Sequence, residues 1–183
     1  IVSVKVAGRS GDVTLEGLVA GVEWTIENAD EFDIRVINLA LDTGDASDYR
    51  SNALAAALER AWDAGITVVT AAGNGGTETN GLGLPASDPL VIAVGGVEAT
   101  QGGMIVPDWT STGNGVRNPD VAAPGKSIES LRAPGSAADV EHPEGFVDAE
   151  RFLGTGSSPS SAVVAGVAAL LLEDRPALTP DQL

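Results

Sequence analysis

The sequence lacks cysteine altogether and is poor in aromatic residues. Without cysteine the chain can form neither a disulfide nor a thiolate metal site, and its redox compartment stays open. Aromatic residues make up 4% of the 183 residues and apolar residues 43%, with 23 glycines, which indicates close backbone packing instead of a core of large rings. This length can bury one sizeable core, so a single domain is expected.

Basic residues are scarce as well. The chain has 10 Lys and Arg against 26 Asp and Glu, a net charge of −16. This balance argues against nucleic acids and anionic membrane surfaces as partners, because both are bound through basic patches. No apolar run approaches the ~18 residues that indicate a membrane span, so no span is expected.

The chain has no initiator Met and no signal peptide at its beginning. Residues Ile1–Val6 have the β-branched content of a strand that is already under way. We therefore expect the chain to be part of a longer polypeptide, with an N-terminal portion missing.

Apolar strands alternate with helical patterns along the chain. The predicted strands lie at 1–6, 35–41, 66–71 and 90–94, and the predicted helices at 15–26, 48–64 and a buried 163–172. Asp12 or Thr14 could cap the first helix, and Gly65 ends the second. This alternation predicts an α/β fold, a doubly wound and mostly parallel sheet with helices on both faces, whose sites lie at the carboxyl ends of the strands. Residues 126–152, rich in Gly, Pro and acid, predict a long surface loop.

Residues 154–166 (Gly-Thr-Gly-Ser-Ser-Pro-Ser-Ser-Ala-Val-Val-Ala-Gly) run from a loop of small residues straight into the last predicted helix. At a helix start the backbone N–H groups point outward and the dipole is positive. A serine oxygen that becomes an alkoxide, or an oxyanion, is stabilised there. The same serines also suit a plain helix N-cap, which the segment alone favours.

Three patterns follow one another in a fixed order. Residues 71–74 (Ala-Ala-Gly-Asn) end a predicted strand, residues 120–125 (Asp-Val-Ala-Ala-Pro-Gly) follow, and the serine segment comes last. With the strands at 36–41 and 91–95, they resemble the subtilisin-like serine proteases, or subtilases, over nearly all 183 residues. The resemblance implies that residues 1–183 are the C-terminal part of a subtilase catalytic domain, with 126–152 as a loop insertion.

Residues 131–136 and the pair Arg151-Phe152 are similar to actinobacterial cell-surface or secreted subtilases. The resemblance therefore implies a serine endopeptidase that acts on a peptide or protein substrate. It also implies a secreted or cell-surface location for the whole protein.

The resemblance assigns the nucleophile to Ser158, through alignment of residues 164–166 (Val-Ala-Gly) with the family's pattern. Three neighbouring hydroxyls compete for this role: those of Ser157, Ser160 and Ser161. Stabilisation of the oxyanion is assigned to the Asn74 side-chain amide and the Ser158 backbone N–H. For an Asn beside Gly, an ordinary turn residue is the alternative interpretation.

The resemblance further implies that an extended peptide is held by main-chain hydrogen bonds along two strand-like segments. The corresponding residues are Ala40, Leu41 and Asp42 in the first segment and Ala71, Ala72 and Gly73 in the second. Asp42 and Thr43 stand where the family has glycines. This departure favours basic or small substrate residues near the pocket, or marks only a polar loop after a buried strand.

Serine chemistry also requires a base, and the family's order of Asp, His and Ser places the first two upstream of Ile1. This chain has one histidine, His142, and its Asp42-Thr43-Gly44 mimics the family's aspartate motif. Order alone permits a triad of Asp42, His142 and Ser158. We reject it because Asp42 holds a substrate-segment position and no His-Gly-Thr helix start accompanies His142. The chain by itself is therefore expected to be nearly inert.

Other interpretations rest on fewer residues. Pro159 beside the nucleophile lends weight to a non-catalytic peptide-binding or structural module with the subtilase fold. A nucleotide-binding domain would depend on residues 73–76 (Gly-Asn-Gly-Gly), but the chain has neither GxGxxG nor a phosphate-loop Lys. The acids Asp88, Asp108 and Asp120 form no recognisable coordination loop, so no metal or cofactor is predicted in this chain. Calcium stays an expectation for the full-length protein.

Overall fold

The computed structural model describes residues 1–8, 11–78 and 81–183. Its main sheet contains β1 (Val36–Leu39), β2 (Thr67–Ala71), β3 (Ile92–Thr100), β4 (Gly103–Ile105) and β5 (Val121–Pro124). Strands β1, β2, β3 and β5 lie side by side and run parallel, and β4 pairs antiparallel with the end of β3. The predicted α/β fold with a mostly parallel sheet is therefore confirmed.

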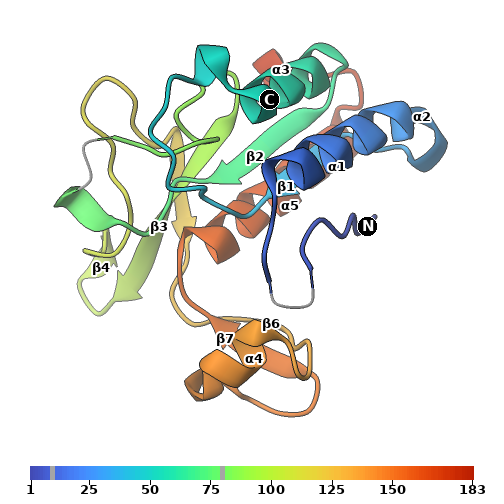
Figure 1. Cartoon of the computed structure of the whole chain (residues 1–183). Coiled ribbons are helices and arrows are strands. Elements are labelled where there is room, and N and C mark those ends of the chain that lie inside the picture. Colours follow the sequence, from blue (N-terminus) through green and yellow to red (C-terminus); the bar gives the residue numbers. More distant parts are fainter. Residues whose placement is uncertain (9–10, 79–80) are drawn as a thin grey trace.

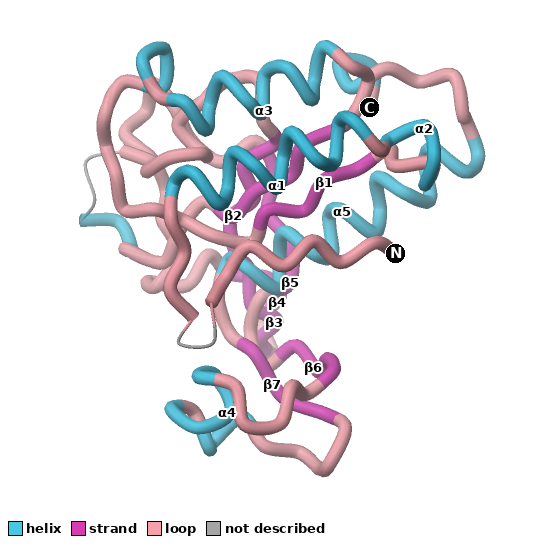
Figure 2. Tube along the Cα trace, turned by 45° about the vertical axis from the view of Figure 1, so that its right-hand side comes forward, coloured by secondary structure: helices cyan, strands magenta, loops and turns pink. Residues whose placement is uncertain are grey.

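Helices cover both faces of this sheet. Helices α1 (Leu15–Glu27) and α3 (Ala53–Asp63) lie on one face and α5 (Ser157–Asp174) on the other (Figures 1 and 2). Successive side chains of a strand point to opposite faces. Accordingly, Val68 of β2 is buried in the cluster with α1 and α3, whereas Val69 is buried in the cluster that α5 joins. The sheet is doubly wound, as expected.

Capping side chains set where the first two long helices begin. The Thr14 hydroxyl accepts a hydrogen bond from Gly17 N at 3.1 Å, which selects Thr14 over Asp12 as the cap of α1. The Asn52 side chain accepts one from Leu54 N at 2.9 Å and starts α3. This helix therefore begins later than the predicted residue 48.

Short elements complete the connections. They are α2 (Ala29–Phe32), α4 (Ala137–Glu141) and the 3₁₀ helices η1 (Tyr49–Ser51), η2 (Gly76–Glu78), η3 (Pro143–Gly145) and η4 (Pro180–Gln182). Helix η1 occupies the stretch just before Asn52 that the sequence assigned to a longer helix.

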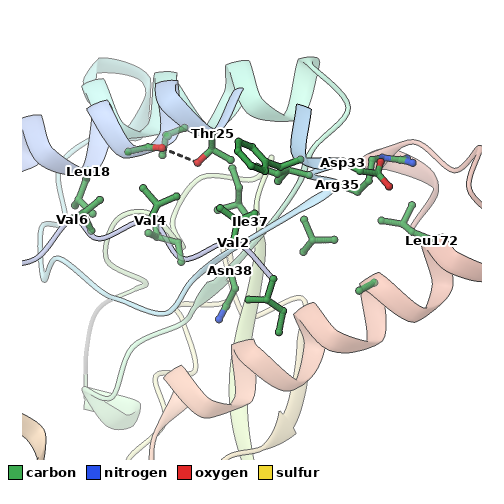
Figure 3. A pocket seen from close by; sticks show the side chains of 18 of the residues that line it. Val2, Val4, Val6, Leu18, Thr25, Asp33, Arg35, Ile37, Asn38 and Leu172 are labelled. Atoms are coloured by element: carbon green, nitrogen blue, oxygen red, sulfur yellow. Dashed lines mark hydrogen bonds between the residues drawn. The ribbon is translucent and has the colours of Figure 1, made fainter. Parts of the chain in front are cut away.

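The predicted strand at Ile1–Val6 is wrong, because this segment forms no ladder in the structure. Among the described residues, β1 has a strand partner on one side only, namely β2. A cavity of about 680 Å³ lies along the other side of β1. Figure 3 shows Val2, Val4 and Val6 lining it near Ile37. A β-branched segment becomes a strand only where a neighbouring strand accepts its hydrogen bonds.

The segment expected as a long surface loop contains regular structure. Strand β6 (Ile128–Leu131) pairs antiparallel with β7 (Arg151–Gly154), and α4 and η3 lie between them in the sequence. We call residues 126–154 the lobe, which projects from the end of the main sheet (Figures 1 and 2). The Arg132 guanidinium pairs with the Asp139 carboxylate and lies 4.9 Å from the Phe146 ring centroid, so the lobe has its own polar and aromatic contacts.

Helix α5 is longer than predicted and less buried. It begins at Ser157, and only some of its residues pack against the sheet. The side chains of Val167 and Leu170 are 51% and 66% exposed. The expectation of a fully buried helix at 163–172 is therefore wrong for one of its faces.

Candidate active site

The predicted site residues gather at the carboxyl edge of the parallel strands. Residues 40–42 follow β1, Asn74 follows β2 by three residues, and the first turn of α5 brings Ser157 and Ser158 to the same edge. Since β1 and β2 pair in parallel, with Leu39 opposite Thr70, the two segments after them leave the sheet side by side. The fold thus places the serine segment against both.

Ser157 joins the last helix to the segment after β2. Its backbone N–H and its hydroxyl both donate to Asn74 Oδ1, at 2.8 and 3.1 Å. Its hydroxyl oxygen also accepts from Gly73 N at 3.1 Å. Because an N–H donor must face an acceptor, these bonds fix which side of the Asn74 amide carries oxygen. The Nδ2 donor group therefore lies on the other side, where no hydrogen bond occupies it within the described chain.

Gly156 permits this close approach. It caps α5 with φ +149°, and its N–H donates to Gly125 O at 2.8 Å. A side chain at this position would meet Asn74 Nδ2 at 3.0 Å. Glycine is therefore required for the helix start to lie against the Asn74 amide.

The four serines at the start of α5 have different surroundings. Ser157, Ser160 and Ser161 are fully buried, whereas Ser158 is partly exposed. The Ser160 and Ser161 hydroxyls donate to carbonyls of their own helix start, those of Gly156 and Ser158. Of the four hydroxyls, the one at Ser158 is therefore the best placed to meet a substrate.

No base contacts Ser158 in the described residues. Its hydroxyl donates to the carbonyl of Ala40 at 3.0 Å. His142 ends α4 in the lobe, has a 62% exposed side chain, and contacts Glu144 at 3.1 Å. The structure thus joins Ser158 to the first substrate segment and gives His142 a separate partner.

The two predicted substrate segments differ in how their backbone groups are used. In the second segment, Ala72 N donates to Val94 O, Gly73 N donates to Ser157 Oγ, and Gly73 O accepts from Ser111 N. Residues 71–73 are also buried. This segment therefore forms a wall for a substrate but leaves few backbone N–H and C=O groups free to bind it. In the first segment, Asp42 is exposed, and its backbone forms no hydrogen bond of this kind with the part of the chain that the structure describes.

Ser111 is a site residue that the sequence reasoning missed. Its N–H donates to Gly73 O at 3.0 Å and its hydroxyl accepts from Gly75 N at 3.1 Å. It therefore holds the turn that presents Asn74. Nothing in the sequence marks this residue, since it lies in an irregular segment more than thirty positions away from that turn.

The acids considered as metal ligands are dispersed. Asp88 is buried, its Oδ1 accepts from Leu90 N at 2.9 Å, and burial raises the pKa of its carboxyl above the usual range. Asp120 pairs with Arg117 at 2.6 Å, and Asp108 is exposed. Across residues 1–8, 11–78 and 81–183, no group of three or more acidic or histidine side chains could hold a metal ion. In the same ranges no helix is long and apolar enough to cross a bilayer.

Two cavities lie beside β1 and the segment that follows it. The cavity of about 680 Å³ along β1 has neither Ser158 nor Asn74 in its lining. A second cavity of about 400 Å³ touches the first substrate segment. Its walls are mostly apolar and include Leu15, Leu18, Leu41, Leu54 and Leu84, with Asp42 and Asp45 at its polar side.

Comparison with known proteins places these features in a family. A model described as the subtilase family matches residues 1–183. The chain is 36% identical over 196 residues to serine protease AprX of Bacillus subtilis, covering 100% of this chain and 44% of that protein. It is 33% identical over 183 residues to subtilisin DY of Bacillus licheniformis, covering 99% and 57%.

Solved structures agree with this result. A cold-adapted subtilisin-like serine proteinase matches with a TM-score of 0.75 at 28% identity, covering 97% of this chain and 55% of that one. Sphericase matches in fold with a TM-score of 0.77 at 22% identity, covering 97% and 56%. The chain therefore spans about half the length of the relatives it matches.

Proposed function

Because the chain belongs to the subtilase family, we propose that the protein containing it is a serine endopeptidase with Ser158 as its nucleophile. The observation that carries this proposal is the arrangement around Ser157, which holds the Asn74 amide beside the N-terminus of α5. Ser158, the next residue, is the serine of that turn with an accessible hydroxyl. Nucleophile and oxyanion donors thus belong to one small structural unit.

In the proposed reaction, Ser158 Oγ attacks the carbonyl carbon of a peptide bond, and its proton passes to a base. The tetrahedral oxyanion accepts hydrogen bonds from Asn74 Nδ2 and from the Ser158 N–H, at the positive end of α5. The C–N bond then breaks, the base returns the proton to the departing amine, and an acyl-enzyme remains on Ser158. Attack by water regenerates the hydroxyl and releases the new carboxyl terminus.

We propose that the base and its orienting aspartate lie in a part of the protein outside this chain. The only histidine of the chain, His142, contacts Glu144 on the exposed lobe. In addition, β1 pairs on one side only within residues 1–8, 11–78 and 81–183, and a largely apolar cavity lies along its other side, whereas proteins normally protect a sheet edge. These features support further sheet beyond β1, and the chain spans only about half the length of the relatives it matches.

Two further properties of the whole protein stay proposals. A secreted or cell-surface location follows from the family resemblance, as does calcium binding by the full-length protein. The acidic composition, with a net charge of −16, is compatible with a saline or calcium-containing medium.

Hydrolysis of a protein substrate such as casein by the full-length protein tests the proposal. We expect activity in the parent, loss of activity in S158A, and retention in S161A, because the Ser161 hydroxyl only bonds to a carbonyl of its own helix. The isolated chain should be nearly inactive. A folded full-length protein without any hydrolysis would favour the non-catalytic peptide-binding module instead.

A further inference from the structure

Asp42 belongs to the segment that contacts the proposed nucleophile. It is two residues after Ala40, whose carbonyl accepts the Ser158 hydroxyl bond at 3.0 Å. A substrate whose scissile bond reaches Ser158 must therefore pass close to Asp42. The subtilase resemblance implies glycine at this position, so the carboxylate is a feature of this chain.

The Asp42 carboxylate lies between two glycines. An added Cβ at Gly73 would clash with its Oδ2, and one at Gly83 would clash with its Oδ1. Gly73 belongs to the wall that follows β2, and Gly83 to the loop before the next strand. The carboxylate thus fills a recess between the two glycines, where a side chain at either position would otherwise lie.

Main-chain hydrogen bonds hold this carboxylate in place. Thr43 N and Thr43 Oγ1 both donate to Leu84 O at 2.9 Å, and Leu84 N donates to Asp45 O at 2.8 Å. Asp42 Oδ1 accepts from Gly44 N at 2.9 Å. Within the described residues, no hydrogen bond reaches Oδ2. One oxygen therefore fixes the orientation while the other stays available.

The carboxylate also lacks a cation. No Lys, Arg or His side chain forms an ion pair with Asp42 in the described residues. The nearest acid along the loop, Asp45, bonds to Ser47 and adds to the negative potential. An acidic recess on a chain of net charge −16 attracts cationic substrates.

We propose that Asp42 makes the protease selective for a basic residue, Lys or Arg, immediately before the scissile bond. This inference rests on the proposed function and names its substrate class. An apolar substrate side chain would cover the carboxylate without pairing it, which is costly for a charged group. A guanidinium or ammonium group would instead pair with Oδ2, the oxygen that accepts no hydrogen bond from the described residues.

Matched peptides test the proposal in the full-length protein. Four fluorogenic peptides differ only in the residue before the cleaved bond: Arg, Lys, Leu or Ala. We expect the highest kcat/KM for Arg and Lys, and a fall of about tenfold or more in the Arg-to-Leu ratio in D42N. Asn preserves the acceptor for Gly44 N, so this variant should stay folded. D63N makes the same charge change at the exposed C-terminal end of α3, outside both substrate segments, and should leave the ratio nearly unaltered.

Two additional measurements separate this inference from the proposed function. Fluorophosphonate labelling of Ser158 reports the nucleophile without any substrate preference, and benzamidine binding reports the acidic recess without catalysis. Labelling together with an Asp42-dependent Arg preference and Asp42-dependent benzamidine binding would support the inference. Labelling together with a preference for Ala or Leu peptides, or with an Arg-to-Leu ratio unchanged in D42N, would overturn it and leave the protease intact. Absence of both labelling and hydrolysis would overturn the proposed function, and with it this inference.

Discussion

Asn74 Oδ1 accepts two hydrogen bonds from Ser157, one from its backbone N–H and one from its hydroxyl. The same hydroxyl accepts a bond from the buried N–H of Gly73. Ser157 of α5 therefore orients the Asn74 side-chain amide, and it also provides the acceptor for the Gly73 N–H just after β2. This contact links the helix start to the sheet, and the chemistry proposed for Ser158 depends on it.

Replacing Asn74 by aspartate separates the two roles of this side chain: Oδ1 accepts the hydrogen bonds from Ser157, and Nδ2 is the proposed donor to the oxyanion. Asp keeps an oxygen for the two Ser157 donors but has no N–H donor. In N74D we expect kcat to fall by about 10²–10³, the range known for loss of one such donor in a subtilisin, with a similar unfolding midpoint. Steady-state kinetics and urea unfolding of the full-length protein check this. A decrease in kcat of less than about fivefold would remove Asn74 from the oxyanion site.

Removing the Ser157 hydroxyl should affect both stability and activity. In S157A, Gly73 N loses its acceptor in a buried environment, which costs about 1–3 kcal/mol of unfolding free energy. The Asn74 amide also loses one of its two constraints, so kcat should decrease. S157T retains the hydroxyl and should behave like the parent. S161A is the matched control, and an equal effect of S157A and S161A in urea unfolding would contradict the assigned role.

Arg117 ties the loop before β3 to the start of β5. Its guanidinium donates to the carbonyls of Ala86, Asp88 and Val91 at 2.9 to 3.0 Å and pairs with Asp120 at 2.6 Å. The R117A variant leaves these largely buried acceptors without a donor, so we expect a loss of about 2 kcal/mol or more in unfolding free energy. R175A removes an exposed arginine that forms an ion pair with the exposed Asp174, and it should change stability little. Similar unfolding midpoints for the two variants would refute this account.

The stability of the lobe should depend on pH through Asp139. Hydrogen bonding from Arg132, and then from Gly135 N, lowers the pKa of the Asp139 carboxyl below the ordinary value of 3.8. A carboxyl with a lowered folded-state pKa stabilises the fold above its ordinary pKa, and this contribution disappears as the pH falls through the folded-state value. NMR of the β6 and β7 amides should show the lobe loosening below about pH 4. In D139N the lobe should be loosened already at pH 7, and an unaltered spectrum in that variant would exclude the effect.

Much of the fold follows from local patterns in the sequence. Helical spacing with a Thr14 cap identifies α1, and a run rich in β-branched residues identifies β2, whose residues are all buried. The predicted start of α3 at residue 48 is too early because the chain offers two caps: Asp48 caps the short helix η1, and Asn52 caps α3. Ile1–Val6 was misassigned because β-propensity carries no information about whether a partner strand is present.

The site was predictable only in part. Ser158 and Asn74 follow from motifs, and the structure brings both into contact with Ser157. The roles of Ser111 and Arg117 depend on contacts between residues distant in sequence, which no local pattern reports. The position of Asp42 between Gly73 and Gly83 likewise requires three separate segments to meet. The sequence alone therefore leaves three interpretations of Asp42 open: a preference for basic substrate residues, a preference for small ones, or a plain polar loop.

Covalent labelling of the full-length protein by a fluorophosphonate, followed by peptide mapping, tests the proposed nucleophile most directly. Our account predicts a single modified residue, Ser158, with labelling lost in S158A and retained in H142A, because the base comes from outside this chain. Modification of another serine, dependence of labelling on His142, or no labelling of the folded protein would contradict it.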